Sequence, residues 1–160
     1  MKSIVASIVA LGFAAAWSVS AQAQVPQYGT AIDLEKAKKV IAVAQAEAKK
    51  NNWPVAIAIV DNHGFLVAFE KLDNTQTASV EIAIDKATSS ATYRRPTKAF
   101  QDVLAGGGAG LRVLNLRGAS TVEGGLPIVI DGKIVGGIGV SGVNADQDGM
   151  VAKAGAEGLK

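Results

Sequence analysis

Apolar residues recur at helical spacing in three segments of the chain. The first segment places one apolar face on Ala37, Val40, Ile41, Ala44 and Ala48. Thr30 and Asp33 stand where a capping box begins, which predicts a helix over about residues 31–50. The second segment carries Val80, Ala83, Ile84, Ala87 and Ala91, and it ends before Pro96 because a residue that precedes proline leaves helical geometry. Residues 146–159 form the third predicted helix, with Met150, Val151 and Ala154 facing inward.

Two hairpins are predicted between these helices. Residues 55–60 alternate branched residues with alanines, as expected of a strand covered on both faces, and residues 65–70 return as its partner after a turn at residues 61–64. Later in the chain, two β-rich runs flank Asp131 and Gly132, the strongest short-range hairpin signal. The second of these runs has glycine at alternate positions, so we expect a ligand to approach its backbone closely.

The region between the hairpins is less regular. Thr97 is placed to cap a short helix over residues 98–104, residues 106–110 are predicted as a glycine-rich loop, and residues 111–122 as partly strand. Hairpins mixed with helices favour an α+β fold, with helices packed against an antiparallel sheet. We predict one such domain over residues 24–160.

The first 23 residues are typical of a secretory signal peptide. Lys2 supplies the positive charge, residues 4–19 are mainly apolar, and Ala21-Gln22-Ala23 provides a small-residue cleavage site. We therefore expect the mature protein to begin near Gln24 and to be periplasmic or secreted.

Composition excludes several classes of function. Without Lys2, the mature chain has 15 basic and 14 acidic residues and no basic stripe, so a nucleic-acid partner is not expected. No apolar run after the signal peptide is long enough to span a membrane. Cysteine is absent and histidine occurs once, so structural zinc is excluded and any site with two imidazoles would have to lie between two copies of the chain.

The chain resembles the GlcG/HbpS family of haem-binding proteins, whose related module also ends the PduO-type corrinoid adenosyltransferases. The resemblance rests on motifs in family order across nearly all of the mature chain: Val60-Asp61-x-x-Gly64-x-Leu66-Val67-Ala68, Lys86-Ala87-Thr88, Arg95-Pro96-Thr97, Gly124-Gly125-x-Pro127-Ile128, Asp131-Gly132, Gly136-x-Ile138-Gly139-Val140-Ser141-Gly142, Gln147-Asp148 and Ala152-x-Ala154-Gly155. It implies a profilin-like fold, a homo-oligomer and, for some exported members, binding of haem and iron. Val143 departs from the family, which commonly has glycine there.

Haem needs an apolar slot, an iron ligand and partners for two propionates. His63, in a predicted turn, is the candidate metal ligand, although a solvated turn residue is the simpler interpretation. Tyr93 and Met150 could also ligate iron, but we expect Tyr93 to pack its ring and Met150 to fill the core.

Candidate anion-binding residues cluster before the short helix. Arg94 and Arg95, fixed against Pro96 beside the Thr97 hydroxyl, form a corner suited to a propionate or another carboxylate. Lys86 matches a family position, although an exposed helix lysine is the ordinary alternative. Asp61 is expected to bond its own turn.

Two functional classes remain open from sequence, beside the simpler alternative of an oligomeric structural protein with no ligand. The first is an exported haem and iron binder for haem capture, storage or sensing. The second is an enzyme or accessory subunit that acts on a small carboxylated metabolite, with Arg94, Arg95 and Lys86 holding the anion and Asp61 or His63 moving a proton.

Overall fold

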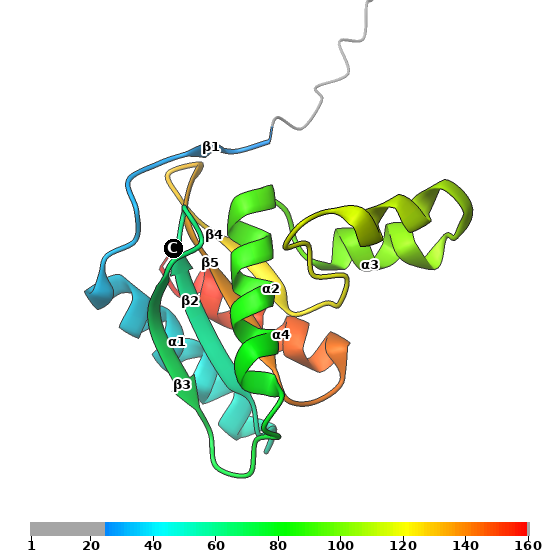
Figure 1. Cartoon of the computed structure of the whole chain (residues 1–160). Coiled ribbons are helices and arrows are strands. Elements are labelled where there is room, and N and C mark those ends of the chain that lie inside the picture. Colours follow the sequence, from blue (N-terminus) through cyan, green and yellow to red (C-terminus); the bar gives the residue numbers. More distant parts are fainter. Residues whose placement is uncertain (1–24, 160) are drawn as a thin grey trace, which may run out of the picture.

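Strand β5 (Lys133–Ser141) organises the sheet in the computed structural model, which describes residues 25–159 (Figure 1). It pairs antiparallel with β2 (Ala56–Asp61) on one side and with β4 (Gly125–Ile130) on the other. β3 (Leu66–Lys71) continues the sheet beyond β2. The short β1 (Gln27–Tyr28) runs parallel to the start of β5. The predicted α+β fold with an antiparallel sheet is therefore confirmed.

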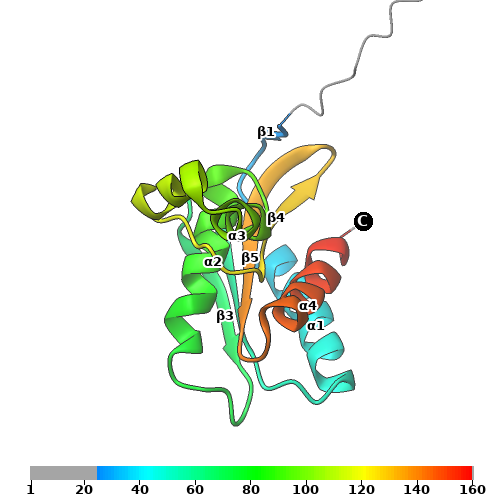
Figure 2. The ribbon, with the colours of Figure 1, turned by 90° about the vertical axis from the view of Figure 1, so that its right-hand side faces the viewer.

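Helices cover both faces of this sheet (Figure 2). α1 (Leu34–Lys50) and α4 (Ala145–Glu157) pack together on one face over a branched aliphatic core, which includes Val40, Ile57, Ile59 and Ile138. α2 (Ser79–Tyr93) lies on the other face, and the contact between this helix and β2 is formed chiefly by alanines from both elements. β2 is buried on both sides as a result, as its alternation predicts.

The glycines of β5 accommodate α2 rather than a ligand. A Cβ at Gly139 would lie 2.0 Å from the Ala83 carbonyl oxygen, and one at Gly137 would lie 2.5 Å from the Ala87 carbonyl oxygen. Contacts this short are impossible without moving the helix, so the glycines permit the helix to approach the strand closely. The prediction that a ligand fills this gap was wrong, because the helix fills it.

Both predicted hairpins are present. The turn between β4 and β5 has positive φ at Asp131 (50°) and Gly132 (72°), the combination that a type I′ turn requires. The turn between β2 and β3 contains Gly64, whose φ is 92°. α1 begins three residues later than predicted, because the Asp33 carboxylate caps it by accepting from the Lys36 backbone N–H.

Two predictions between and after the hairpins were wrong. Residues 111–122 contain no strand: the 3₁₀ helix η1 (Gly108–Asn115) follows α3 (Lys98–Ala105), and a loop leads to β4. Met150 does not fill the core, since its side chain is 56% exposed on α4. The predicted signal peptide lies outside the described residues, and no helix within 25–159 is long and apolar enough to cross a membrane.

Candidate functional site

His63 lies exposed in the turn between β2 and β3. Asp61 shapes this turn: its Oδ1 accepts hydrogen bonds from the backbone N–H groups of His63 (2.8 Å) and Phe65 (3.0 Å). This arrangement is an Asx-type turn, so the prediction that Asp61 bonds its own turn is confirmed. The imidazole is left accessible at the end of a strand whose backbone is fixed by the sheet.

Contacts link this turn to the C-terminal half of α2 and to β1. Thr88 Oγ1 donates to the Gly64 carbonyl oxygen (3.2 Å), and Asn62 Nδ2 donates to the Gly29 carbonyl oxygen (2.7 Å). Tyr28, next to Gly29, donates its hydroxyl to the carbonyl oxygens of Ala91 and Thr92. The turn, β1 and the end of α2 therefore form one continuous surface.

Arg94 belongs to the same surface. It ends α2 in a left-handed conformation (φ 54°), and its guanidinium carbon lies 5.4 Å from the centroid of the Tyr28 ring. This is cation–π geometry, which holds the guanidinium beside β1. An anionic ligand on this surface would therefore meet a positioned cation.

Large apolar side chains are also exposed here. Phe65 is 72% exposed, Leu66 51% and Tyr28 44%. Phe65 and Leu66 directly follow the His63 turn in the chain, and Tyr28 lies against Arg94. Exposed apolar groups thus share this surface with an imidazole and a cation, a combination that suits a flat, amphiphilic ligand. We name the set Tyr28, His63, Phe65, Leu66 and Arg94 the His63 face.

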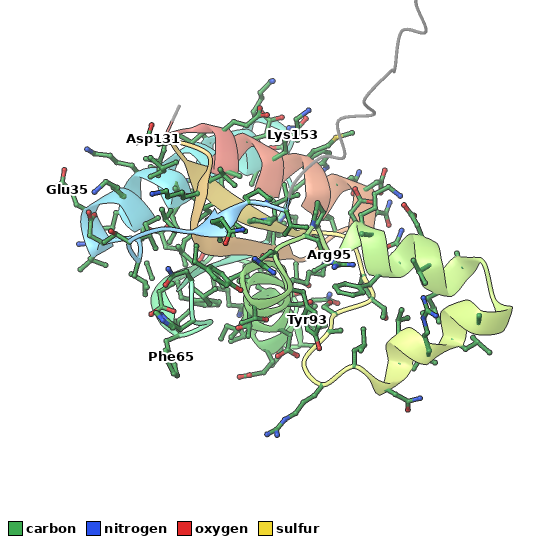
Figure 3. The ribbon with its side chains drawn as sticks, turned by 90° about the horizontal axis from the view of Figure 1, so that it is seen from above. Glu35, Phe65, Tyr93, Arg95, Asp131 and Lys153 are labelled. Atoms are coloured by element: carbon green, nitrogen blue, oxygen red, sulfur yellow. The ribbon has the colours of Figure 1, made fainter. Side chains whose placement is uncertain are left out.

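Arg95 points away from this face. Its guanidinium carbon lies 5.5 Å from the centroid of the Phe100 ring on α3, and Figure 3 shows Arg95 and Tyr93 on the α3 side, far from Phe65. Tyr93 packs edge-to-face on Phe100 with 5.2 Å between centroids and donates its hydroxyl to the Arg117 carbonyl oxygen, as expected of a packed tyrosine. The adjacent arginines therefore do not form a single corner.

Thr97 is fully buried and connects α3 to β4. Its Oγ1 accepts from the Gly125 backbone N–H (2.9 Å), and its own N–H donates to the Gly125 carbonyl oxygen (3.0 Å). The side chain makes no capping hydrogen bond to α3, contrary to prediction. In this position the hydroxyl fastens an edge strand.

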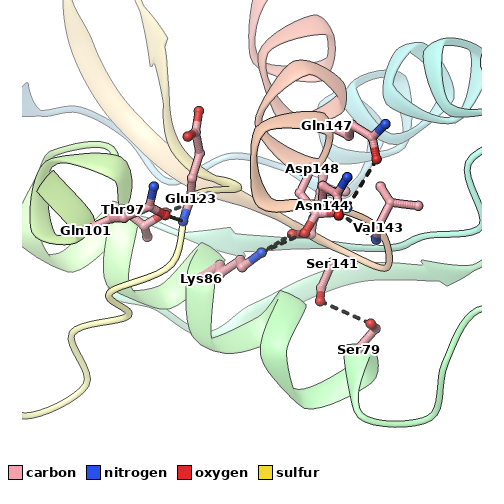
Figure 4. A network of polar contacts seen from close by, with 12 residues as sticks. Ser79, Lys86, Thr97, Gln101, Glu123, Ser141, Val143, Asn144, Gln147 and Asp148 are labelled. Atoms are coloured by element: carbon pink, nitrogen blue, oxygen red, sulfur yellow. Dashed lines mark hydrogen bonds and ion pairs between the residues drawn. The ribbon is translucent and has the colours of Figure 1, made fainter. Parts of the chain in front are cut away.

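Lys86 is buried in an ion pair, unlike the exposed lysine that is usual on a helix. Its Nζ lies 2.9 Å from Asp148 Oδ2 and 3.0 Å from the Val140 carbonyl oxygen, and both charged side chains are at most 2% exposed (Figure 4). Asp148 Oδ1 also accepts from the Val143 N–H. Burial raises the pKa of Asp148 above its ordinary value, and the Lys86 ammonium opposes that rise.

Sequence reasoning missed the role of Asp148. Asp148, Val151, Ala152 and Gly155 share the buried side of α4 at spacing i, i+3, i+4 and i+7. If the apolar stripe of this helix begins at residue 148, the pattern places the Asp148 carboxylate on the buried side, where it needs a cationic partner. Within residues 25–159, no group of three or more histidine, aspartate or glutamate side chains is arranged to hold a metal ion.

Comparisons with known proteins agree with the fold. The family described as "Haem degrading protein HbpS-like" matches residues 32–157. Protein GlcG of Escherichia coli K12 is 39% identical over 107 residues, which cover 67% of this chain and 78% of GlcG. The Salmonella typhimurium corrinoid adenosyltransferase PduO is 29% identical over 126 residues, covering 77% of this chain but only 37% of PduO.

Solved structures give the same picture. A double mutant of Streptomyces reticuli HbpS superposes with a TM-score of 0.75 at 30% identity, covering 92% of this chain and 99% of that one. The crystal structure of a PduOC–haem complex superposes with a TM-score of 0.72 at 26% identity, covering 81% of this chain and 95% of that one.

Proposed function

Because the chain belongs to the HbpS-like family, we propose that it binds haem, and that the His63 face is the binding site. The solved haem complex of a similar fold is the observation that carries the proposal of haem binding. The geometry of the described residues supports the choice of face.

The residues of the His63 face match what haem requires. Haem is a flat apolar plate with two carboxylates and an iron that accepts imidazole. Phe65, Leu66 and Tyr28 supply exposed apolar surface, and the exposed His63 imidazole is the proposed iron ligand. Arg94 supplies a guanidinium for one propionate.

A buried acceptor beside His63 adds support. Asn62 is 8% exposed, and its Oδ1 is the one buried side-chain oxygen or nitrogen in the described part of the chain without a hydrogen-bond partner. A buried acceptor without a partner costs stability, which is consistent with a turn whose conformation serves binding. Haem held here would supply a redox-active iron and strong visible absorption.

The proposal extends to location and assembly. The predicted signal peptide of residues 1–23 supports a periplasmic or secreted protein that captures, stores or senses haem. The chain has one histidine, so a second imidazole on the same iron would have to come from a second copy. A homo-oligomer, which the family resemblance implies, is also part of the proposal.

The other candidate ligand-binding residues predicted from the sequence lie away from the His63 face or are engaged in buried contacts. Lys86 and Thr97 are engaged in buried contacts, and Arg95 lies on the α3 side, so these residues do not converge with Arg94. The alternative of an enzyme that holds a small carboxylate between Arg94, Arg95 and Lys86 lacks the geometry that it needs.

A haem titration followed by absorbance tests the proposed function. The chain from Gln24 keeps every described helix and strand and is the suitable sample. A saturable, stoichiometric Soret shift with micromolar or tighter affinity supports the proposal. A linear, non-saturating response from the folded protein would reject it.

A further inference from the structure

An open cavity lies at the opposite end of β2 from His63. It has a volume of about 570 Å³, within the range of small-molecule sites. Its walls come from the C-terminal turn of α1, from the connection between α1 and β2, and from the segment that follows β3. β2 has six residues, so about 20 Å of strand separates this cavity from the His63 turn.

The apolar wall of this cavity consists of Trp53, Pro54 and Leu72. Trp53 is half-buried and packs against the core between α1 and the sheet. An indole with one side on the core and the other on a cavity is a rigid platform for stacking a flat group. The cavity therefore favours a planar ligand.

The polar rim favours an anion. Lys49 and Lys71 both line the cavity, and no carboxylate within residues 25–159 forms an ion pair with either ammonium. Asp73 is an acidic residue on the same rim, so the lining residues carry an excess of one positive charge. The Glu70 carboxylate lies just outside the rim, where it accepts a hydrogen bond from Gln45. Asn52 and Asn74 add amide groups for hydrogen bonding.

The end of α1 does not cancel this preference. A helix C-terminus normally repels anions through its free carbonyl groups. Here the Ala48 carbonyl oxygen accepts from the Trp53 and Asn51 N–H groups, and the Lys49 carbonyl oxygen accepts from the Asn52 N–H. These carbonyls are satisfied by the chain, which leaves the lysines to set the local charge.

The backbone around the cavity is held in an unusual conformation. Asn52 (φ 56°) and Asn74 (φ 62°) are two of the four non-glycine residues with positive φ in the described part of the chain. Asparagine adopts this conformation more readily than most residues, and Asn52 directly follows the C-cap of α1. The two asparagines therefore fix the shape of the cavity wall.

We propose that this cavity, the Trp53 pocket, binds a small planar carboxylate, with the ring stacked on Trp53 and the carboxylate held by Lys49 and Lys71. The site is independent of haem binding at His63. Benzoate is the simplest probe of this chemistry, and benzyl alcohol is its uncharged counterpart.

The Trp53 indole N–H provides the measurement. Benzoate is titrated into ¹⁵N-labelled protein, and the indole resonance is assigned by its loss in Trp53→Phe. A saturable shift is expected, with benzyl alcohol binding at least about tenfold more weakly because it lacks the charge-assisted contacts. The Lys49→Gln/Lys71→Gln variant should weaken benzoate binding by a similar factor, while Lys38→Gln, an exposed lysine elsewhere on α1, should leave it unchanged.

Three results would overturn the inference. The indole resonance could fail to shift saturably, or the double-lysine variant could bind benzoate as well as the unmodified protein. Loss of the haem Soret change in the double-lysine variant would show that the Trp53 pocket is the haem site and not a separate one. A failure of haem binding with an intact benzoate response would reject the proposed function alone.

Discussion

Breaking the Lys86–Asp148 pair should destabilise the protein strongly. At 2.9 Å the Coulomb attraction is about 6 kcal/mol in an effective dielectric constant of about 20, and the cost of burying both charges offsets most of it. Replacing Asp148 by Asn removes the attraction but leaves the Lys86 ammonium 1% exposed. We therefore expect a loss of about 3–5 kcal/mol in the free energy of unfolding.

Denaturant unfolding of the single and double variants measures this effect. Lys86→Met should cost a similar amount at neutral pH, whereas Lys86→Met/Asp148→Leu should recover most of the loss, because no charge stays buried. A loss below about 1 kcal/mol for Asp148→Asn, or a double variant no more stable than the singles, would refute the reasoning.

The same pair gives a pH dependence. The pKa of Asp148 is raised in the folded state, so its contribution to stability is fully present at low pH and declines as pH rises through that folded pKa. Lys86→Met removes the opposing ammonium and raises this pKa further. The deficit of Lys86→Met relative to the unmodified protein should therefore shrink as pH falls toward about 4. A deficit that grows on acidification would contradict this sign.

Substitutions at three further positions test the packing, the backbone conformation and the hydrogen bonding. Gly139→Ala should lower the free energy of unfolding by about 3 kcal/mol or more, because the added Cβ would meet the backbone of α2. In the control Gly106→Ala the nearest atom to the added Cβ is 3.4 Å away, so the change should be less than about 0.5 kcal/mol. Equal effects in denaturant unfolding would contradict the packing. At position 94, where φ is 54°, Gly should be more stable than Ala by about 1 kcal/mol, a difference readable as a higher Tm. Thr97→Val should cost about 1–3 kcal/mol by orphaning the Gly125 N–H and leave haem affinity unchanged; weaker haem binding at unchanged stability would instead make Thr97 a ligand residue.

Most helices and strands were predictable because each is specified by residues that are close together in the sequence. The alternation of branched residues and alanines predicted β2, and the Asp131-Gly132 pair predicted the hairpin of β4 and β5. The apolar stripe of α1 gave its buried face without correction. Each of these features depends on residues within a few positions of one another.

The errors concern contacts between distant segments. The β5 glycines indicate a close approach, but sequence alone does not say whether a ligand or α2 makes it. Lys86 and Asp148 are 62 residues apart, so their pairing has no local signature. Arg94 and Arg95 are adjacent, yet the left-handed backbone at Arg94 sends their side chains to different neighbours.

The candidate site was predictable only in part. The accessible His63 turn followed from sequence, because Asp61 and Gly64 specify it locally. Its apolar surroundings did not, since Tyr28 reaches it from β1 through contacts with α2. A surface assembled from three elements becomes visible only in the fold.

The haem affinity of His63→Ala tests the central claim most directly. It is compared with the unmodified protein and with Lys38→Ala, an exposed control on α1. If haem binds at the His63 face, His63→Ala should weaken binding by at least about tenfold and alter the Soret position, while Lys38→Ala behaves like the unmodified protein. Unchanged affinity and an unchanged spectrum in His63→Ala would contradict the assignment of haem to this face.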